Sequence, residues 1–138
     1  MTNFWDDAEI IDRYSRADAL TEGTLVEADP ELLRDAGIRY PLAYTTAVFH
    51  DCIEWSGRDN RKNVYQDQQG REWDVLTRAA DAMRRARHLP ERTVPFTVLR
   101  IPRLSRATTP GPVTLYVNVG PGDDGAPVLT VMDDPAEL

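Results

Sequence analysis

The sequence predicts a single α+β domain in which N-terminal helices pack on one face of a C-terminal three-stranded antiparallel meander. The apolar residues follow a helical spacing before Pro90 and an alternating, strand-like spacing after it. With 138 residues and 41% hydrophobic content, the chain can bury one core without disulfides or metal ions. We expect residues 1–13 to form a flexible acidic arm and residues 14–138 to form the domain.

The first predicted helix covers residues 16–22. Ser15 and Asp18 have the Ser-x-x-Asp spacing of a capping box, and Gly23 is a typical helix stop. The segment Thr-Leu-Val-Glu-Ala that follows predicts a short strand over residues 24–28.

Two further helices are predicted before residue 56. Residues 29–31, Asp-Pro-Glu, form a start signal, because Asp caps helices and Pro suits the first helical position. Gly37 ends this second helix. A third helix is expected over residues 45–55, where Val48 and Cys52 lie on one apolar stripe. Cys52 is therefore expected to be a buried core residue.

A polar segment and then a strongly helical segment follow. Residues 57–70 are polar and predict the longest and most mobile loop of the chain. Residues 71–88 carry the strongest helical pattern, because Trp73, Leu76 and Ala80 fall on one stripe.

Three strands are predicted after this helix. Residues 94–101 form the first, and Pro95 indicates an edge strand or a strand start. Residues 113–119 alternate between apolar and polar side chains, as expected for a half-buried strand. The turn-forming residues 120–125 then lead into a returning strand over residues 128–132.

The basic charge of this acidic chain is concentrated in residues 78–106, which hold eight arginines and two acidic residues in a chain of net charge −7. We expect Arg71 and Arg78 to lie on the helix surface and to pair with Asp74 and Asp81. The candidate basic residues for binding a partner or nucleic acid are Arg84, Arg85, Arg87, Arg100, Arg103 and Arg106. If the sheet folds back on the helix, these residues gather on one side of the molecule. They are not interleaved with aromatic residues, which argues against a stacking platform for single strands.

Acidic residues gather near both chain ends and in the predicted turn. The candidate acidic binding residues are Asp6, Asp7, Asp123, Asp124, Asp133 and Asp134. Such carboxylates could mimic nucleic-acid phosphates and occupy a basic channel. The ordinary alternative is that they keep the termini and turns soluble. A net charge of −7 is also modest beside the charge density of duplex DNA.

No catalytic, metal or cofactor site is predicted. Residues two apart on a helix point to opposite sides, so His50 and Cys52 are not expected to form a nucleophilic pair. Two histidines and one cysteine are too few for a four-ligand Cys/His zinc site. The N-terminal residues lack the pattern of a signal peptide, and no apolar run approaches the length of a membrane span. We therefore expect a cytoplasmic protein that does not bind membranes.

Four motifs carry a resemblance to a known family. They are Tyr-Ser-Arg-Ala-x-Ala from residue 14, Tyr-Pro-x-Ala-x-Thr-x-Ala-Val from residue 40, Trp-Asp-Val-Leu from residue 73 and Gly-Pro-Gly-Asp-Asp-Gly from residue 120. With them the chain resembles a small domain-of-unknown-function family encoded by bacterial phages, plasmids and integrative elements. The resemblance supplies no established activity or catalytic residues, and it implies the setting of a mobile element.

These observations favour an accessory protein of a mobile element that acts by stoichiometric macromolecular binding and not by catalysis. The first hypothesis is a protein partner, with inhibition of a host nucleic-acid-handling defence complex of the anti-CRISPR or anti-restriction type. The alternative is a nucleic-acid-binding accessory or regulatory protein that uses the basic residues between Arg84 and Arg106. A third hypothesis is an enzyme without a readable motif.

Overall fold

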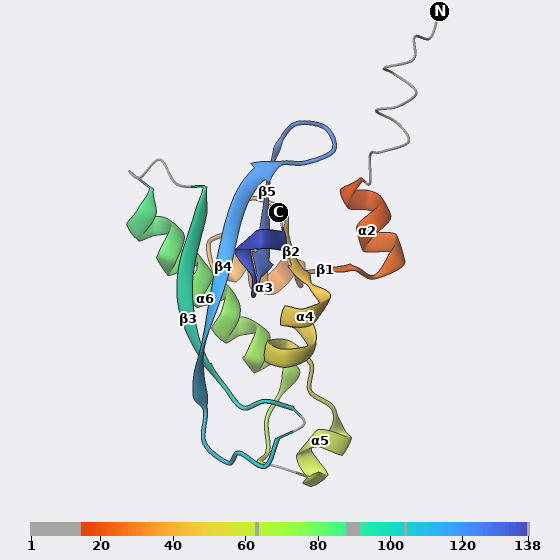
Figure 1. Cartoon of the computed structure of the whole chain (residues 1–138), viewed down its shortest axis with the longest axis vertical. Helices are drawn as coiled ribbons and strands as arrows, with labels where there is room; N and C mark the ends of the chain where they lie inside the picture. The colour runs from red at the N-terminus through yellow and green to blue at the C-terminus, as the bar shows by residue number, and fades with distance from the viewer. Residues whose placement is uncertain (1–14, 63, 88–91, 104, 138) are drawn as a thin grey trace, which may run out of the picture.

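The computed structural model describes residues 15–62, 64–87, 92–103 and 105–137. The predicted acidic arm over residues 1–13, with Asp6 and Asp7, lies outside these residues. Within them, helices and strands mix as the α+β class requires, and five strands form one sheet in the order β1-β2-β5-β4-β3. Helix α6 lies along one face of this sheet, and the N-terminal helix α2 lies beside its β1–β2 side (Figure 1).

Helix α2, Arg16–Glu22, confirms the first prediction. The Ser15 side chain accepts a hydrogen bond from the Asp18 N–H at 2.9 Å, and the Asp18 carboxylate accepts from the Ser15 N–H at 3.4 Å. This reciprocal pair is a capping box. Gly23 follows with φ 83°, a left-handed conformation that favours glycine and ends the helix.

The short strand and the second helix also agree with the sequence. Strand β1 is Leu25–Glu27 and helix α3 is Pro30–Asp35. The Asp29 side chain caps α3 by accepting the N–H of Glu31 at 2.9 Å. Gly37, at φ 81°, then turns the chain back toward the sheet.

The predicted third helix over residues 45–55 is wrong at both ends. Strand β2, Leu42–Thr45, takes its first residue, and the helical part is α4, Thr46–Val48, followed by the π-helical turn η1, Phe49–Ile53. The strand was missed because Leu42, Ala43 and Tyr44 are all buried, so no alternation marks it.

The polar segment 57–70 was predicted as a loop, and this is wrong for a large part of it. Helix α5, Gly57–Lys62, begins within it, and helix α6, Gln68–Ala86, starts before the predicted residue 71. Ser56 and Asp59 hold the start of α5, because the Ser56 N–H donates to the Asp59 carboxylate at 2.8 Å and the Asp59 N–H donates to Ser56 Oγ at 3.3 Å.

The three C-terminal strands form the expected antiparallel meander. They are β3, Thr93–Arg100, β4, Gly111–Pro121, and β5, Pro127–Met132. The predicted sheet was nevertheless too small. Strand β2 pairs parallel to β5, and β1 pairs antiparallel to β2, so the sheet is five-stranded and mixed. A parallel pair needs a long crossover, which local sequence does not reveal.

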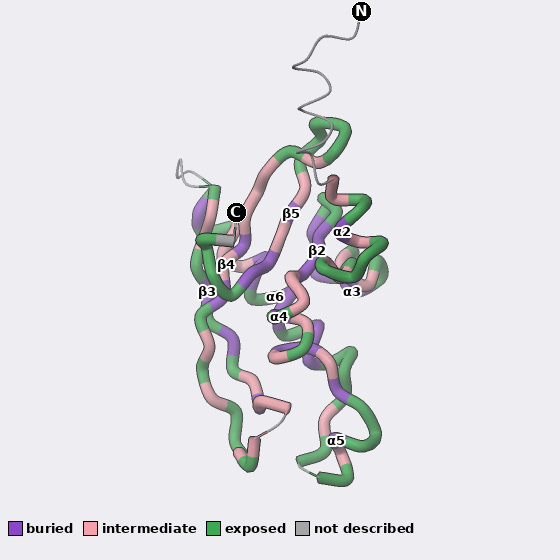
Figure 2. Tube along the Cα trace, turned by 45° about the vertical axis from the view of Figure 1, so that its right-hand side comes forward, coloured by how far each residue is buried: buried purple, intermediate pink, exposed green. Residues whose placement is uncertain are grey.

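The core lies between α6 and the sheet. Val75, Leu76 and Ala79 of α6 are fully buried, as are Leu115 and Val117 of β4. Figure 2 shows buried residues concentrated in β2 and toward the end of β5, whereas α5 is largely exposed. The buried stripe of Val75, Leu76 and Ala79 therefore holds α6 against the sheet.

The prediction that the helices pack on only one face of the sheet is wrong. The Arg16 guanidinium of α2 donates to Thr130 Oγ1 at 2.8 Å. Leu129 and Val131, on either side of Thr130, belong to the core that α6 covers. Side chains alternate along a strand, so Thr130 faces the other way and α2 reaches toward the opposite face.

A carboxylate is also buried in the core. Glu72 of α6 is 9% exposed and accepts hydrogen bonds from the Tyr44 hydroxyl and from the Asp29 N–H, both at 2.9 Å. Burial, followed by the negative charge of Glu72, raises the pKa of Tyr44. Glu72 therefore joins α6 to β2 and to the start of α3.

Candidate functional site

The predicted basic residues do not gather on one side of the molecule. Arg84, Arg85 and Arg87 lie at the C-terminal end of α6 or just beyond it, whereas β3 runs back along the helix and brings Arg100 and Arg103 to its other end (Figure 1). With a rise of about 1.5 Å per residue, the two ends of α6 are roughly 27 Å apart. The set is therefore two separate groups.

The group at the start of α6 is held in internal ion pairs. Arg100 contacts the Asp51 carboxylate at 3.1 Å. Arg103 contacts both Glu54 and Asp59, the latter at 3.0 Å. These contacts attach the end of β3 and the following loop to the segment from η1 to α5. Arg106, in the same loop, is exposed.

Arg71 is not the surface residue that the sequence predicted. It is 5% exposed, and its guanidinium donates to the backbone carbonyls of Ile53, Ile101 and Asp51 at 2.9–3.1 Å. The guanidinium carbon also lies 4.6 Å from the centre of the Trp55 ring. Arg71 is therefore a structural residue that joins three chain segments. On the same helix, Asp81 pairs with Arg85 at 2.9 Å.

The only cysteine of the sequence is a buried core residue, as predicted. Cys52 is buried, and burial, followed by the charge of Asp51, raises the pKa of its thiol to about 12. His50 pairs instead with Glu54, 2.8 Å from its Nδ1. Across the described ranges, no group of three or more His, Cys, Asp or Glu side chains could hold a metal ion.

The acidic residues of the hairpin and the C-terminal segment have different surroundings. Asp123 accepts the backbone N–H groups of Arg16 and Ala17 at 2.9 and 3.0 Å, so it caps the N-terminus of α2. Asp124 and Asp134 each accept the N–H two residues later, which is a local turn contact. Asp133 is exposed.

Replacing Asp123 by alanine should lower the free energy of unfolding by about 1 kcal/mol, because two N–H groups of α2 lose their acceptor. Urea unfolding at neutral pH measures this change. The control is Asp133→Ala, which removes the same charge from an exposed position. Equal effects of the two substitutions would mean that the cap does not contribute to the free energy of unfolding.

The arginines at the other end of α6 line a surface depression of about 260 Å³. Its lining residues are Gly37, Ile38, Arg39, Tyr40, Ala80, Met83, Arg84, Arg87 and Leu129. We call Arg39, Tyr40, Arg84 and Arg87 the arginine–tyrosine surface.

Helix α6 contributes one of its faces to the depression. Ala80, Met83, Arg84 and Arg87 follow the i, i+3, i+4, i+7 spacing, so they lie on one side of the helix. Ala80 is buried and Met83 is half-buried, while both arginines are exposed. The apolar residues therefore form the floor and the arginines the rim.

The turn after α3 supplies the other wall. Ile38 is 8% exposed and Leu42 is 1% exposed, and these two anchors leave Arg39 and Tyr40 on the surface between them. The turn is fixed to the sheet, because the Leu129 N–H donates to the Pro41 carbonyl at 2.8 Å. The backbone that carries Tyr40 is thus fixed, and the Tyr40 side chain is 48% exposed.

The chemistry of this depression is cationic and aromatic. Three arginines and one tyrosine surround an apolar floor, and no acidic residue lines it among the residues that the structure describes. The sequence predicted Arg84 and Arg87 but missed Arg39 and Tyr40. No aromatic residue is interleaved with Arg84 and Arg87 along the chain, and Tyr40 joins them in the depression from a distant segment. An available signal was the placement of Arg39, Tyr40 and Pro41 between the apolar residues Ile38 and Leu42.

The chain is therefore a small α+β protein with an arginine-rich, aromatic surface depression. It belongs to DUF6573, a family of unknown function, whose model matches residues 1–137. The resemblance to a domain-of-unknown-function family is confirmed at that level. No curated protein and no solved structure gives a significant match to the chain. None of the described helices is long and apolar enough to cross a membrane.

Proposed function

We propose that the protein is a non-enzymatic binding protein that contacts nucleic acid through the arginine–tyrosine surface. The observation that carries the proposal is the convergence of Arg39, Arg84, Arg87 and Tyr40 on one apolar depression. The sequence suggested nucleic-acid binding by the basic residues between Arg84 and Arg106. The proposed surface keeps Arg84 and Arg87 from that set and adds Arg39 and Tyr40.

The residue types suit phosphates and bases together. Arginine binds phosphate oxygens through two parallel N–H donors, which lysine cannot do. An exposed tyrosine ring offers a face on which a base can stack. Because the whole chain carries a net charge of −7, electrostatic attraction of a nucleic acid is restricted to the arginine–tyrosine surface. Binding should therefore be local and strongly dependent on salt.

The setting of a bacterial mobile element is a further part of this proposal, and it rests on the sequence resemblance. A cytoplasmic accessory role would follow from that setting. The hypothesis that acidic residues occupy a basic channel of a host defence complex stays a prediction. One of the acidic residues in that hypothesis, Asp123, already serves as the cap of α2.

The proposal is tested by fluorescence anisotropy with labelled DNA and RNA single strands over a range of salt concentrations. In the double variant Arg84→Gln/Arg87→Gln, affinity should fall, and the slope of log K against log salt should shrink by about one per arginine. The matched control is Arg58→Gln/Arg61→Gln. It makes the same charge change on exposed residues of α5, which lies toward the opposite end of the molecule (Figure 1).

The control should bind like the unmodified protein. An absence of binding at low salt, or an equal loss in both double variants, would contradict the proposal.

A further inference from the structure

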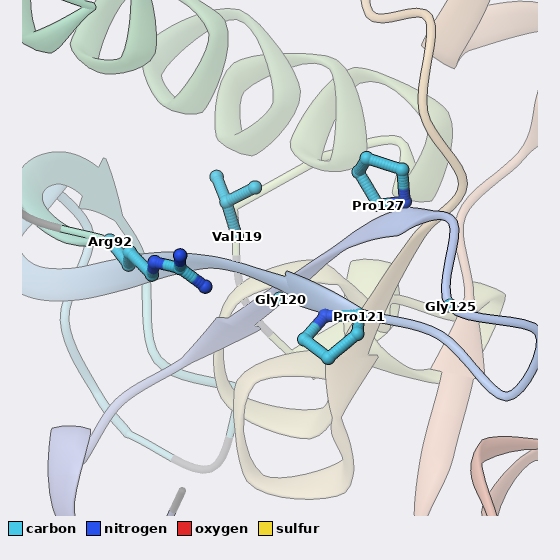
Figure 3. Close-up of a pocket in the computed structure, with 6 residues that line it drawn as sticks. All are labelled: Arg92, Val119, Gly120, Pro121, Gly125 and Pro127. Atoms are coloured by element: carbon cyan, nitrogen blue, oxygen red, sulfur yellow. The ribbon is translucent and has the colours of Figure 1, made fainter.

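A second depression, of about 330 Å³, lies at the end of the β4–β5 ribbon. Its lining residues are Arg92, Val119, Gly120, Pro121, Gly125 and Pro127. Figure 3 shows Val119 and Pro127 on the side of the ribbon that faces α6, with the Arg92 side chain alongside the strand. This depression is mainly apolar and has one cation at its edge.

The two depressions adjoin each other in the sheet. Val119 lines the second and Leu129 lines the first, and these residues are direct partners across β4 and β5. Directly opposed residues have Cα atoms about 4.5–5.5 Å apart and side chains on the same face. The apolar floor therefore continues from Met83 and Leu129 to Val119.

Arg92 is held at the far end of this floor. Its backbone carbonyl accepts the Val119 N–H at 2.8 Å, and the Asn118 side-chain amide lies 3.4 Å from the same oxygen. The side chain itself is exposed. The result is an apolar track with Arg84 and Arg87 at one end and Arg92 at the other.

We infer that this track binds a single-stranded nucleic acid longer than a dinucleotide, with Arg92 contacting a phosphate beyond those of the two nucleotides nearest Tyr40. The inference rests on the proposed function and adds the ligand class and a second contact. A single strand is favoured over a duplex because its base faces are free to cover apolar surface and to stack on tyrosine. A duplex presents its phosphates outward and keeps its bases paired and stacked.

The test uses oligothymidylates from the dinucleotide to about twelve nucleotides, a range typical for single-strand sites. The slope of log K against log salt concentration is measured for the unmodified full chain and for Arg92→Gln. For the longer oligomers the variant should lose about one unit of slope, whereas for the dinucleotide it should match the unmodified protein. Arg106→Gln, an exposed arginine on the loop between β3 and β4, is the control and should change neither slope.

The outcomes separate this inference from the proposed function. If oligomers bind but Arg92→Gln has no effect, or the same effect at every length, the second contact is refuted while the proposed function stands. Equal affinity for a duplex would overturn the single-strand assignment. If polyglutamate displaces the oligomer as well as unlabelled oligomer does, the partner is an acidic protein and the ligand class is wrong. Failure of every oligomer to bind overturns the proposed function as well.

Discussion

Replacing Arg71 by methionine is expected to lower the free energy of unfolding by about 3–5 kcal/mol. Methionine can fill much of the space of the arginine stem, but it cannot donate hydrogen bonds. The carbonyls of Ile53, Ile101 and Asp51 would each lose a charged donor in or near the protein interior. The guanidinium contact with the Trp55 ring would also be lost. The cost should be large because an unsatisfied buried polar group is not rescued by water.

Urea unfolding at neutral pH measures this loss, and Arg78→Met is the matched control. Arg78 lies two turns further along α6, is exposed, and undergoes the same change of charge and shape. Its substitution should change the free energy of unfolding by no more than about 0.5 kcal/mol. If both variants unfold at the same urea concentration, the buried contacts of Arg71 contribute no more than a surface side chain.

The sequence could not distinguish these two arginines. They are seven residues apart and share one helical edge, so spacing alone places both on the surface. The difference arises from the segments that pack on the first turns of α6, namely η1 and the residues after β3. A buried arginine is recognisable only once its acceptors are known, and these lie far away in sequence.

Local capping signals predicted the first helix well. The Ser15-x-x-Asp18 capping box and the stop at Gly23 gave the bounds of α2. The same pattern at Ser56-x-x-Asp59 precedes polar residues, and the segment was therefore predicted as a loop. In the structure both pairs start helices, so the capping chemistry was the better indicator than polarity.

The candidate site could be predicted only in part, for a topological reason. Arg84 and Arg87 stood out because they lie in a basic segment of an acidic chain. Tyr40 reaches them because β2 pairs parallel to β5 and carries the preceding turn to α6. Such a non-local pairing leaves no mark in the local spacing of residues.

The second large effect is expected from Arg103, which is the cation for Glu54 and Asp59. Arg103→Gln should lower the free energy of unfolding at pH 7 by about 2 kcal/mol. This is less than for a fully buried ion pair, because Arg103 is partly exposed and Ser56 continues to donate to Asp59. The 7% exposed Asp59 carboxylate would then lack its cation.

The pH dependence gives this prediction its sign. Burial alone would raise the pKa of Asp59, but hydrogen bonds from Ser56 and the contact with Arg103 outweigh it, so the pKa lies below its usual value. A carboxyl group with a lowered pKa stabilises the fold above pH about 4, and this contribution is lost as the pH falls through the folded-state pKa. The gap between the unmodified protein and Arg103→Gln should therefore be widest near neutral pH and shrink below pH about 4.

Urea unfolding at a series of pH values from neutral to acidic measures this gap directly. Arg106→Gln, an exposed arginine on the same loop, should give no gap at any pH, which accounts for the general effect of net charge. A gap for Arg103→Gln that keeps its full size in acid would assign the role of Arg103 to the packing of its stem. A gap that closes with the protonation of Asp59 would show that the ion pair of Arg103 holds the loop after β3 to α5, and that this predicted arginine serves the fold.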